Sequence, residues 1–175
     1  MPAFTRSRVF LILAASLLTL GIVWVSLAHL GGPTARSFAE ADFHAPNFGL
    51  LLSQPLAVQL HVYSALAALA IGTFVLLRPK GTASHKFVGW AWVIAMAITA
   101  ISSLFIMEIN DGMFSFIHLF SGWTLVALPM GIYAIRRRHL RGHRGAMAGT
   151  FFGGLIVAGA FTFIPGRLMW AIFFG

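Results

Sequence analysis

Five long apolar stretches, separated by short polar segments, dominate the pattern of the chain. They cover residues 9–30, 56–77, 87–107, 113–135 and 146–164. A helix that crosses a bilayer needs about 20 apolar residues, and a lone strand cannot satisfy its backbone in lipid. We interpret the first stretch as a retained helix, because its apolar run is longer than that of a signal peptide. The pattern predicts an all-α integral membrane bundle of five transmembrane helices, with one membrane domain over residues 1–175.

The charge balance predicts how this bundle is oriented. Charged residues make up 9% of the chain, against about 25% in soluble domains, which excludes an ordinary soluble enzyme. The net charge is +8, and ten of the 12 basic residues fall on one side if the helices alternate: Arg6, Arg8, Arg78, Lys80, Lys86, Arg136, Arg137, Arg138, Arg141 and Arg144. The positive-inside rule then predicts a cytoplasmic N-terminus. The basic residues indicate topology and contact with anionic membrane lipids, so we expect no nucleic acid partner.

The predicted exported loop over residues 31–55 admits two interpretations. Ser37 and Glu40 have the spacing of a capping box, which favours a short surface helix. The alternative is an irregular loop with aromatic anchors.

Helices two to five resemble two copies of one unit. His61 and Ser64 match His118 and Ser121 at an offset of 57 residues, while His85 matches His143 at an offset of 58. The repeat units cover residues of about 59–107 and 116–165. Each unit crosses the membrane twice, so the predicted repeat is parallel. The two offsets differ by one residue, which we call the slip. On this interpretation it is absorbed near Pro129, because proline kinks a helix.

The repeat predicts one histidine pair near each membrane face. The outer pair is His61 with His118, and the inner pair is His85 with His143. A histidine in an apolar span suggests function, and neutral imidazole is a good metal ligand. Two ligands are too few for structural zinc, but they suit the two axial positions of haem iron.

Small residues provide room for a flat macrocycle near three of these histidines. They are Ala65, Gly122 and Gly89, each one helical turn beyond its histidine. The chain has no cysteine, so a c-type attachment is excluded and the cofactor would be haem b, one or two per chain. Alternatively, the outer histidines hydrogen-bond to Ser64, Ser121 or Gln59 and bind nothing, and the inner ones are solvated.

Other apolar and small residues are interpreted as packing positions. Two small-residue ridges, which favour close helix packing in lipid, are Ser64, Ala68 and Gly72 on the second helix and Gly145, Gly149 and Gly153 on the fifth. Trp90, Trp92 and Trp123 are interpreted as interface and packing residues. His29, His44 and His139 have no partner in register, and we do not expect them to be ligands.

The histidine layout resembles that of the cytochrome b561 superfamily of transmembrane di-haem cytochromes. The resemblance covers about residues 59–167 and rests on the two histidine pairs. The segment from His85 to Gly89 and the basic double-copy layout are also similar to an uncharacterised family of small predicted bacterial membrane proteins. The cytochrome resemblance implies two bis-histidine b haems, one near each face.

Three function classes follow from these patterns. The leading hypothesis is a b-type cytochrome of the bacterial inner membrane that transfers electrons, with a quinone or a redox protein as partner. The second is a cofactor-free accessory subunit of a larger membrane complex. The third is a transporter with a histidine-lined path, against which the absence of mid-membrane charge counts.

Overall fold

The computed structural model describes residues 37–38, 40–106 and 117–174 of the chain. Within these residues the fold is all-helical and contains no strand. Four of the described helices are long and apolar enough to cross a membrane: Leu56–Leu77, Ala83–Ser103, His118–Arg136 and Leu140–Phe163. The predicted first helix over residues 9–30 lies outside the described residues, as do Arg6, Arg8, His29, Glu108 and Asp111.

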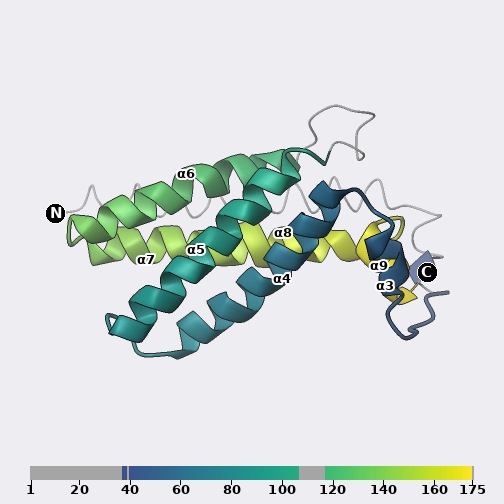
Figure 1. Ribbon diagram of the computed structural model, residues 1–175, viewed down its shortest axis with the longest axis horizontal. Coiled ribbons are helices and arrows are strands. Elements are labelled where there is room, and N and C mark those ends of the chain that lie inside the picture. The colour runs from purple at the N-terminus through teal and green to yellow at the C-terminus, as the bar shows by residue number, and fades with distance from the viewer. Residues whose placement is uncertain (1–36, 39, 107–116, 175) are drawn as a thin grey trace, which may run out of the picture. The chain divides into compact units, whose positions relative to one another are not determined.

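The first helical hairpin joins α4 (Leu56–Leu77) to α5 (Ala83–Ser103), and the two helices run side by side in Figure 1. The turn contains Gly81 in a left-handed conformation (φ 86°), which glycine adopts without a steric penalty. Thr82 then caps α5, because its Oγ1 accepts the backbone N–H of His85 at 3.1 Å. The cap satisfies one of the free amides of the first turn.

The second hairpin joins α6 (Ile117–Arg136) to a long composite helix. Its segments are α7 (Leu140–Gly149), the π-helix η2 (Thr150–Val157), α8 (Ala158–Ala160) and the 3₁₀-helix η3 (Phe161–Phe163). π-Helical segments are rare and often occur at functional sites. Contacts connect α4 to α5, α5 to α6, α6 to α7 and η2, and η2 back to α4.

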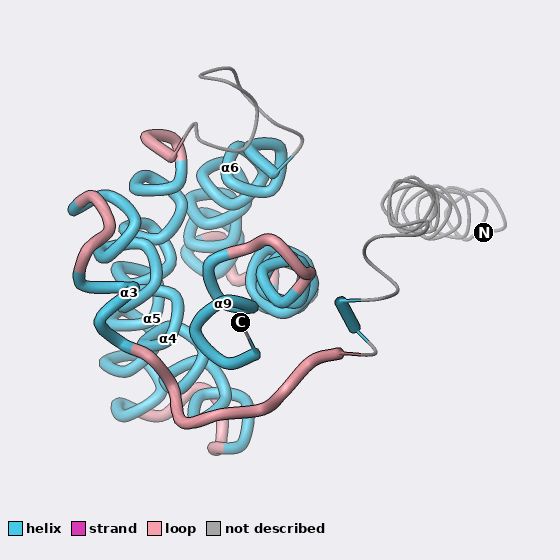
Figure 2. The backbone as a smooth tube through the Cα atoms, turned by 90° about the vertical axis from the view of Figure 1, so that its right-hand side faces the viewer, coloured by secondary structure: helices cyan, strands magenta, loops and turns pink. Residues whose placement is uncertain are grey.

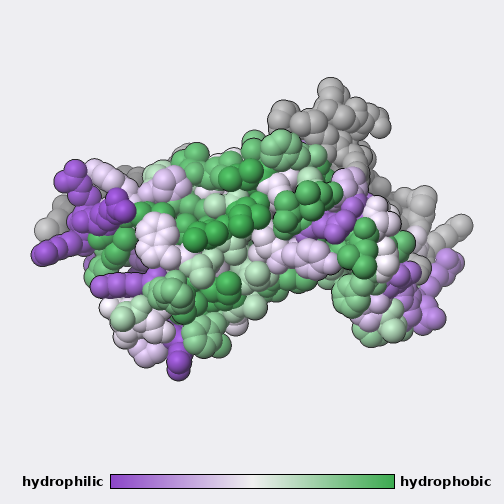
Figure 3. Space-filling model, in the orientation of Figure 1, coloured by the Kyte–Doolittle hydropathy of each residue, from purple (hydrophilic) through white to green (hydrophobic). Residues whose placement is uncertain are grey.

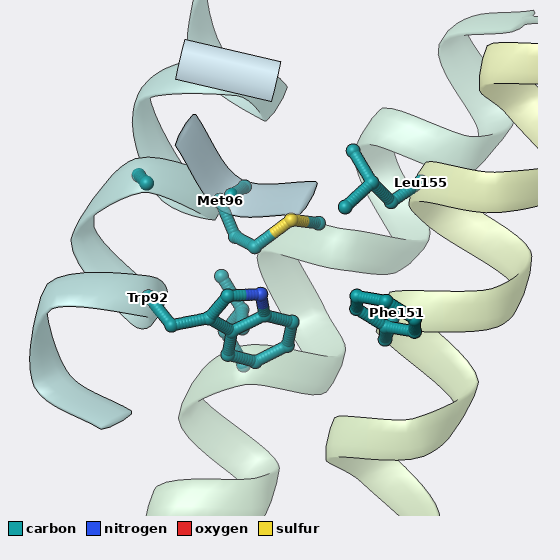
Figure 4. Close-up of a cluster of buried hydrophobic side chains, with 7 residues drawn as sticks. Trp92, Met96, Phe151 and Leu155 are labelled. Atoms are coloured by element: carbon teal, nitrogen blue, oxygen red, sulfur yellow. The ribbon is translucent and has the colours of Figure 1, made fainter. Parts of the chain in front are cut away.

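The centre of the bundle is packed around aromatic side chains. Figure 4 shows Trp92 and Met96 of α5 facing Phe151 and Leu155 of η2. The ridge Ser64, Ala68 and Gly72 of α4 is buried, as predicted. A Cβ atom at Gly72 would lie only 2.5 Å from Trp92 Nε1 and 2.6 Å from a ring carbon of Phe151. Only glycine therefore lets α4 approach these two rings as closely as it does.

The second predicted ridge is not a packing surface among the described residues. No described atom lies within 4 Å of a Cβ position at Gly145, Gly149 or Gly153, and the first two are exposed. The close approach on this helix instead occurs at Gly154, whose Cβ position would be 2.7 Å from Thr124 Oγ1. Packing of the ridge through Gly145, Gly149 and Gly153 against residues outside the described ranges stays a prediction.

Two short helices cover the end of the bundle where α4 begins and α5 ends. Figure 2 is seen from this end, which carries α3 (Phe48–Leu52) and α9 (Leu168–Phe174). Leu51, Val58 and Ile172 form a buried cluster there, and the backbone N–H of Asn47 donates to the carbonyl of Ile172 at 3.0 Å. The predicted loop therefore does contain a short helix, although it lies after the predicted cap at Ser37. We call this the cavity end, for the reason given below.

The opposite end carries the basic loops and is called the basic end. Figure 3 shows polar residues gathered there and apolar residues over the middle of the bundle. Arg78 stacks over Phe74 at 5.0 Å and Arg137 over Tyr133 at 5.4 Å, measured from the guanidinium carbon to the ring centroid. These cation–π contacts hold one arginine of each loop against its preceding helix.

Helix bounds differ from the predicted ones where polar turns continue a helix. The helix predicted over 87–107 is found at 83–103, and the one predicted to start at 146 starts at Leu140. In both cases the first turns contain polar residues, which a hydropathy pattern does not count as helix. The helix predicted over 113–135 is described from Ile117 to Arg136.

The two hairpins share their register at an offset of 57 residues rather than 58. Arg138 has a positive φ of 57°, 57 residues after Gly81, and α7 starts 57 residues after α5. No slip is therefore needed at Pro129, which lies inside α6. His85 is the third residue of its helix and His143 the fourth of its helix, so the slip lies within those first turns. The duplication itself stays a prediction.

Candidate functional site

The cavity end of the bundle contains a cavity of about 780 Å³. This volume is in the upper part of the range of ligand sites, roughly 300–1,000 Å³. Residues of α4, α5, α6, η2, α8 and the segment around Arg167 line it. Most of the lining is apolar, and the main polar residues in it are Gln54, His61, Thr99, Ser103, Ser121, Thr124, Thr162 and Arg167. A largely apolar site with a few placed polar groups is typical of a cofactor or small-molecule site.

His61 lies in the wall of this cavity and is fixed by a hydrogen bond. Its Nδ1 donates to the backbone carbonyl of Thr99 on α5, at 2.9 Å. An imidazole that donates through Nδ1 keeps the lone pair on Nε2, and this second hydrogen bond is the usual one of a metal-binding histidine. Among the described residues no hydrogen bond to Nε2 of His61 occurs. His61 therefore has the hydrogen bonding of a ligand with a free coordinating atom.

This hydrogen bond differs from those of the alternative interpretation, in which His61 bonds to a neighbouring side chain and binds no ligand. The histidine does bond across helices, but to the Thr99 carbonyl and not to a side chain of Ser64, Ser121 or Gln59. Gln59 donates instead to the carbonyls of Leu52 and Gln54. The interhelical bond therefore uses only one of the two ring nitrogens of His61.

Inter-helix hydroxyl bonds stiffen the helices around the cavity. Thr99 Oγ1 donates to Ser64 Oγ at 2.8 Å, which connects α5 to α4. Ser103 and Ser121 share a hydrogen bond between their hydroxyls, which connects α5 to α6. Thr99 thus positions His61 through its carbonyl and the backbone of α4 through its hydroxyl.

The predicted outer pair is only half assembled at the cavity. His118 is buried in α6, with 7% of its surface exposed, but it is not among the residues that line the cavity. Ser121, one turn later, does line it. Of the small residues, Ala65 lines the cavity, whereas Gly122 is exposed and lies outside the lining. His61 and Ala65 of the predicted set therefore lie at the cavity, and His118 and Gly122 lie outside its lining.

The predicted inner pair lies at the basic end, on the first turns of α5 and α7. His143 and Lys80 lie close enough to His85 to interact with it electrostatically. Nδ1 of His143 donates to the carbonyl of Gly131 on α6 at 3.1 Å, which repeats the arrangement of His61. Nδ1 of His85 is buried and has no hydrogen-bond partner among the described residues, and Gly89 follows it with no described atom within 4 Å of its Cβ position.

Sequence reasoning missed several residues at the cavity. Met96 and Met169 line it and carry thioether sulfur, the other axial ligand that b- and c-type haems use beside histidine. Thr99 gave no signal, because its role depends on a backbone carbonyl. His139 is exposed and His44 is half-buried, and neither lines the cavity. Within the described ranges no cluster of three or more metal-ligating side chains occurs, so the site offers a metal only one or two protein ligands.

The comparisons with known proteins give one match. The sequence profile of the DUF2306 family, described as predicted membrane proteins, matches residues 58–174. No curated protein and no solved structure matches the chain. The match covers both histidine pairs, the cavity lining except Gln54, and the four described apolar spans from the third residue of α4 onward.

Proposed function

We propose that this chain, which belongs to the DUF2306 family of predicted membrane proteins, is a small b-type cytochrome that transfers electrons across a membrane. That it is a multi-pass membrane protein follows from the family and the four apolar helices. Haem and electron transfer are our proposal. The observation that carries it is His61, which borders a 780 Å³ apolar cavity with Nδ1 held by Thr99.

The residues at the cavity fit a b haem in three respects. Nε2 of His61 would provide a nitrogen ligand to the iron, and Arg167 in the lining would provide a cation for the haem carboxylates. The remaining lining excludes water, because it consists mainly of aliphatic and aromatic side chains. When bound, haem supplies a one-electron iron couple, while the chain sets its potential through ligand, burial and charge.

A second ligand to the iron would come from α6, α5 or α9. The sequence pairs His61 with His118, which is buried nearby on α6 but outside the cavity lining. Met96 and Met169 lie in the lining. We propose His118 as this second ligand, as the histidine layout implies. The alternative is a methionine thioether, and spectra of the methionine variants distinguish the two.

An inner haem at His85 and His143 completes the proposed electron path. Its support is the electrostatic proximity of the two histidines and the hydrogen bond that fixes His143. We propose the bacterial plasma membrane as the location, with the basic end facing the cytoplasm. A quinol or a redox protein is the proposed electron donor.

A reduced-minus-oxidised absorbance spectrum of the purified full chain tests the proposal. Expression with ample haem precursor should give the bands of low-spin haem b. His61→Gln should abolish the signal of the outer haem, because the amide can still donate to the Thr99 carbonyl but is a poor iron ligand. His139→Gln is the matched control, since His139 is exposed and lies outside the cavity lining, and its replacement should leave the signal of the outer haem unchanged.

Absence of haem bands from the wild-type chain would overturn the proposal. Co-purification with a large membrane complex and no iron by elemental analysis would then favour the accessory-subunit hypothesis. Metal-dependent uptake by proteoliposomes of the purified chain would favour the transporter hypothesis. If the His61→Gln chain keeps the outer haem signal, His61 is not a ligand.

A further inference from the structure

The cavity has a polar end with a charged residue and a mostly apolar body. Gln54 and Arg167, which precede α4 and follow η3, lie at the cavity end of the bundle. The lining then follows α4 from Val58 to Leu69, which is roughly 16 Å of helix at 1.5 Å per residue. Its inner part is bordered by Leu69, Met96 and Leu155. A molecule that fills this cavity therefore meets an arginine at one end only, while the hydroxyls of Thr99 and Thr124 lie along its body.

Arg167 is an unpaired cation at that polar end. The residue is half-buried, and no side chain or carbonyl within the described part of the chain forms a hydrogen bond or an ion pair with its guanidinium. Burying part of an unpaired charge is unfavourable. No described neighbour of Arg167 provides a partner for its guanidinium. The guanidinium can therefore bind a ligand.

The backbone around Arg167 holds it in place. Gly166 has a φ of 86°, which lets the chain turn out of η3. The N–H of Arg167 donates to the carbonyl of Ile164 at 3.1 Å, and its own carbonyl accepts the N–H of Ala171 at 3.0 Å. The guanidinium is thus carried by a fixed turn between η3 and α9.

The opposite wall of the cavity suits a broad apolar body. Gly154, Ala158 and Gly159 line it from the composite helix, and Ala65 lines it from α4. Small side chains on two facing helices leave width for a ring or a bent acyl chain. Among anions, a carboxylate matches the planar fork of arginine through two parallel hydrogen bonds.

We propose that the cavity binds an amphipathic carboxylate, with the carboxylate on Arg167 and the apolar body between Ala65 and Gly154. Haem b and long-chain fatty acids both have this chemistry. For haem the inference rests on the proposed function, and it names Arg167 as the carboxylate partner. For a fatty acid it stands without that function.

The test compares acids with their esters. The probes are haem b, haem dimethyl ester, palmitate and methyl palmitate, and their binding to the full-length chain in detergent is measured by native mass spectrometry. The wild-type chain should prefer the acid of at least one pair over its ester by about tenfold or more, because hydrogen bonds to a charged group are strong. Arg167→Gln should remove this preference while it leaves ester binding unchanged.

Two further variants make the test specific to Arg167. Arg144→Gln removes an exposed arginine of the basic end and should keep the preference for the acid. Arg167→Lys keeps the charge without the fork and should retain part of it. Ester binding by Arg167→Gln serves as the readout of folding, since a collapsed cavity would lose all four probes.

The outcomes separate this inference from the proposed function. If palmitate binds with an Arg167-dependent preference and haem does not bind, the inference stands and the cytochrome proposal fails. If haem binds at His61 but neither pair shows a preference that Arg167→Gln removes, the inference is wrong and the cytochrome proposal stands. If the wild-type chain binds none of the four probes, both are wrong.

Discussion

The two halves of α4 use the same kind of small-residue face for different purposes. Near the basic end, Gly72 is in contact with the rings of Trp92 and Phe151 and leaves no space for a single extra carbon. Near the cavity end, His61 and Ala65 border a cavity of about 780 Å³. Near the basic end, aromatic side chains fill the bundle. Near the cavity end, η2 and α8 contribute glycine and alanine instead. Small residues thus lead to close packing where large ones face them, and to a cavity where other small ones face them.

The packed half should respond most strongly to a single methyl group. We expect Gly72→Ala to destabilise the chain by about 1–3 kcal/mol, because the core has to shift two aromatic rings to accept it. Gly122→Ala is the matched control: Gly122 lies in a span, is exposed, and no described atom lies within 4 Å of its Cβ position. It should be neutral or slightly stabilising, since alanine favours helix over glycine.

The measurement for this pair is thermal unfolding in detergent followed by tryptophan fluorescence, since the chain has no cysteine for a thiol-reactive dye. Equal unfolding midpoints for Gly72→Ala and Gly122→Ala would show that the close approach of α4 to Trp92 does not exist in the folded protein.

The cavity half should accept a larger side chain and lose its ligand. Ala65→Leu adds three carbons at a position that lines the cavity, so its loss of stability should stay below about 1 kcal/mol, less than that of Gly72→Ala. Haem or palmitate bound by the wild-type chain should be largely displaced. The readouts are the unfolding midpoint and ligand retention on the same preparation. An unfolding midpoint below that of Gly72→Ala would reverse the contrast between the two halves.

Hydropathy was enough to predict α4 and the membrane class, but not which faces meet. The structure buries the predicted ridge through Ser64, Ala68 and Gly72, because aromatic residues of α5 and η2 face it. No described neighbour packs against the ridge through Gly149. The close approach of the same composite helix occurs at Gly154, on another face. Small residues are compatible with packing on any face, so their partners decide which face is used.

The candidate site was predictable to the same degree. His61 and Ala65 follow from the spacing of a histidine and a small residue in an apolar span, and Arg167 is one of the two basic residues outside the ten that the charge balance assigns to one side. The contribution of Thr99 was not predictable, since it uses a backbone carbonyl on a neighbouring helix. The side of α6 that faces the cavity was not predictable either, because His118 and Ser121 are both buried and only the packing of α5 decides between them.

The smallest expected effect concerns the hydroxyl that connects the two helices beside His61. Thr99→Val removes the bond from Thr99 to Ser64 and keeps the carbonyl that accepts from His61, so we expect a loss of about 0.6 kcal/mol, the mean for such bonds in membranes. Thr73→Val is the control, because Thr73 is exposed and bonds only to the carbonyl of Leu69 in its own helix. Both unfolding midpoints and the haem spectrum should be compared. If Thr99→Val loses the signal of the outer haem while its stability is unchanged, the hydroxyl of Thr99 positions His61 and the carbonyl does not. The cavity half would then depend on side-chain hydrogen bonds, as the packed half depends on ring contacts.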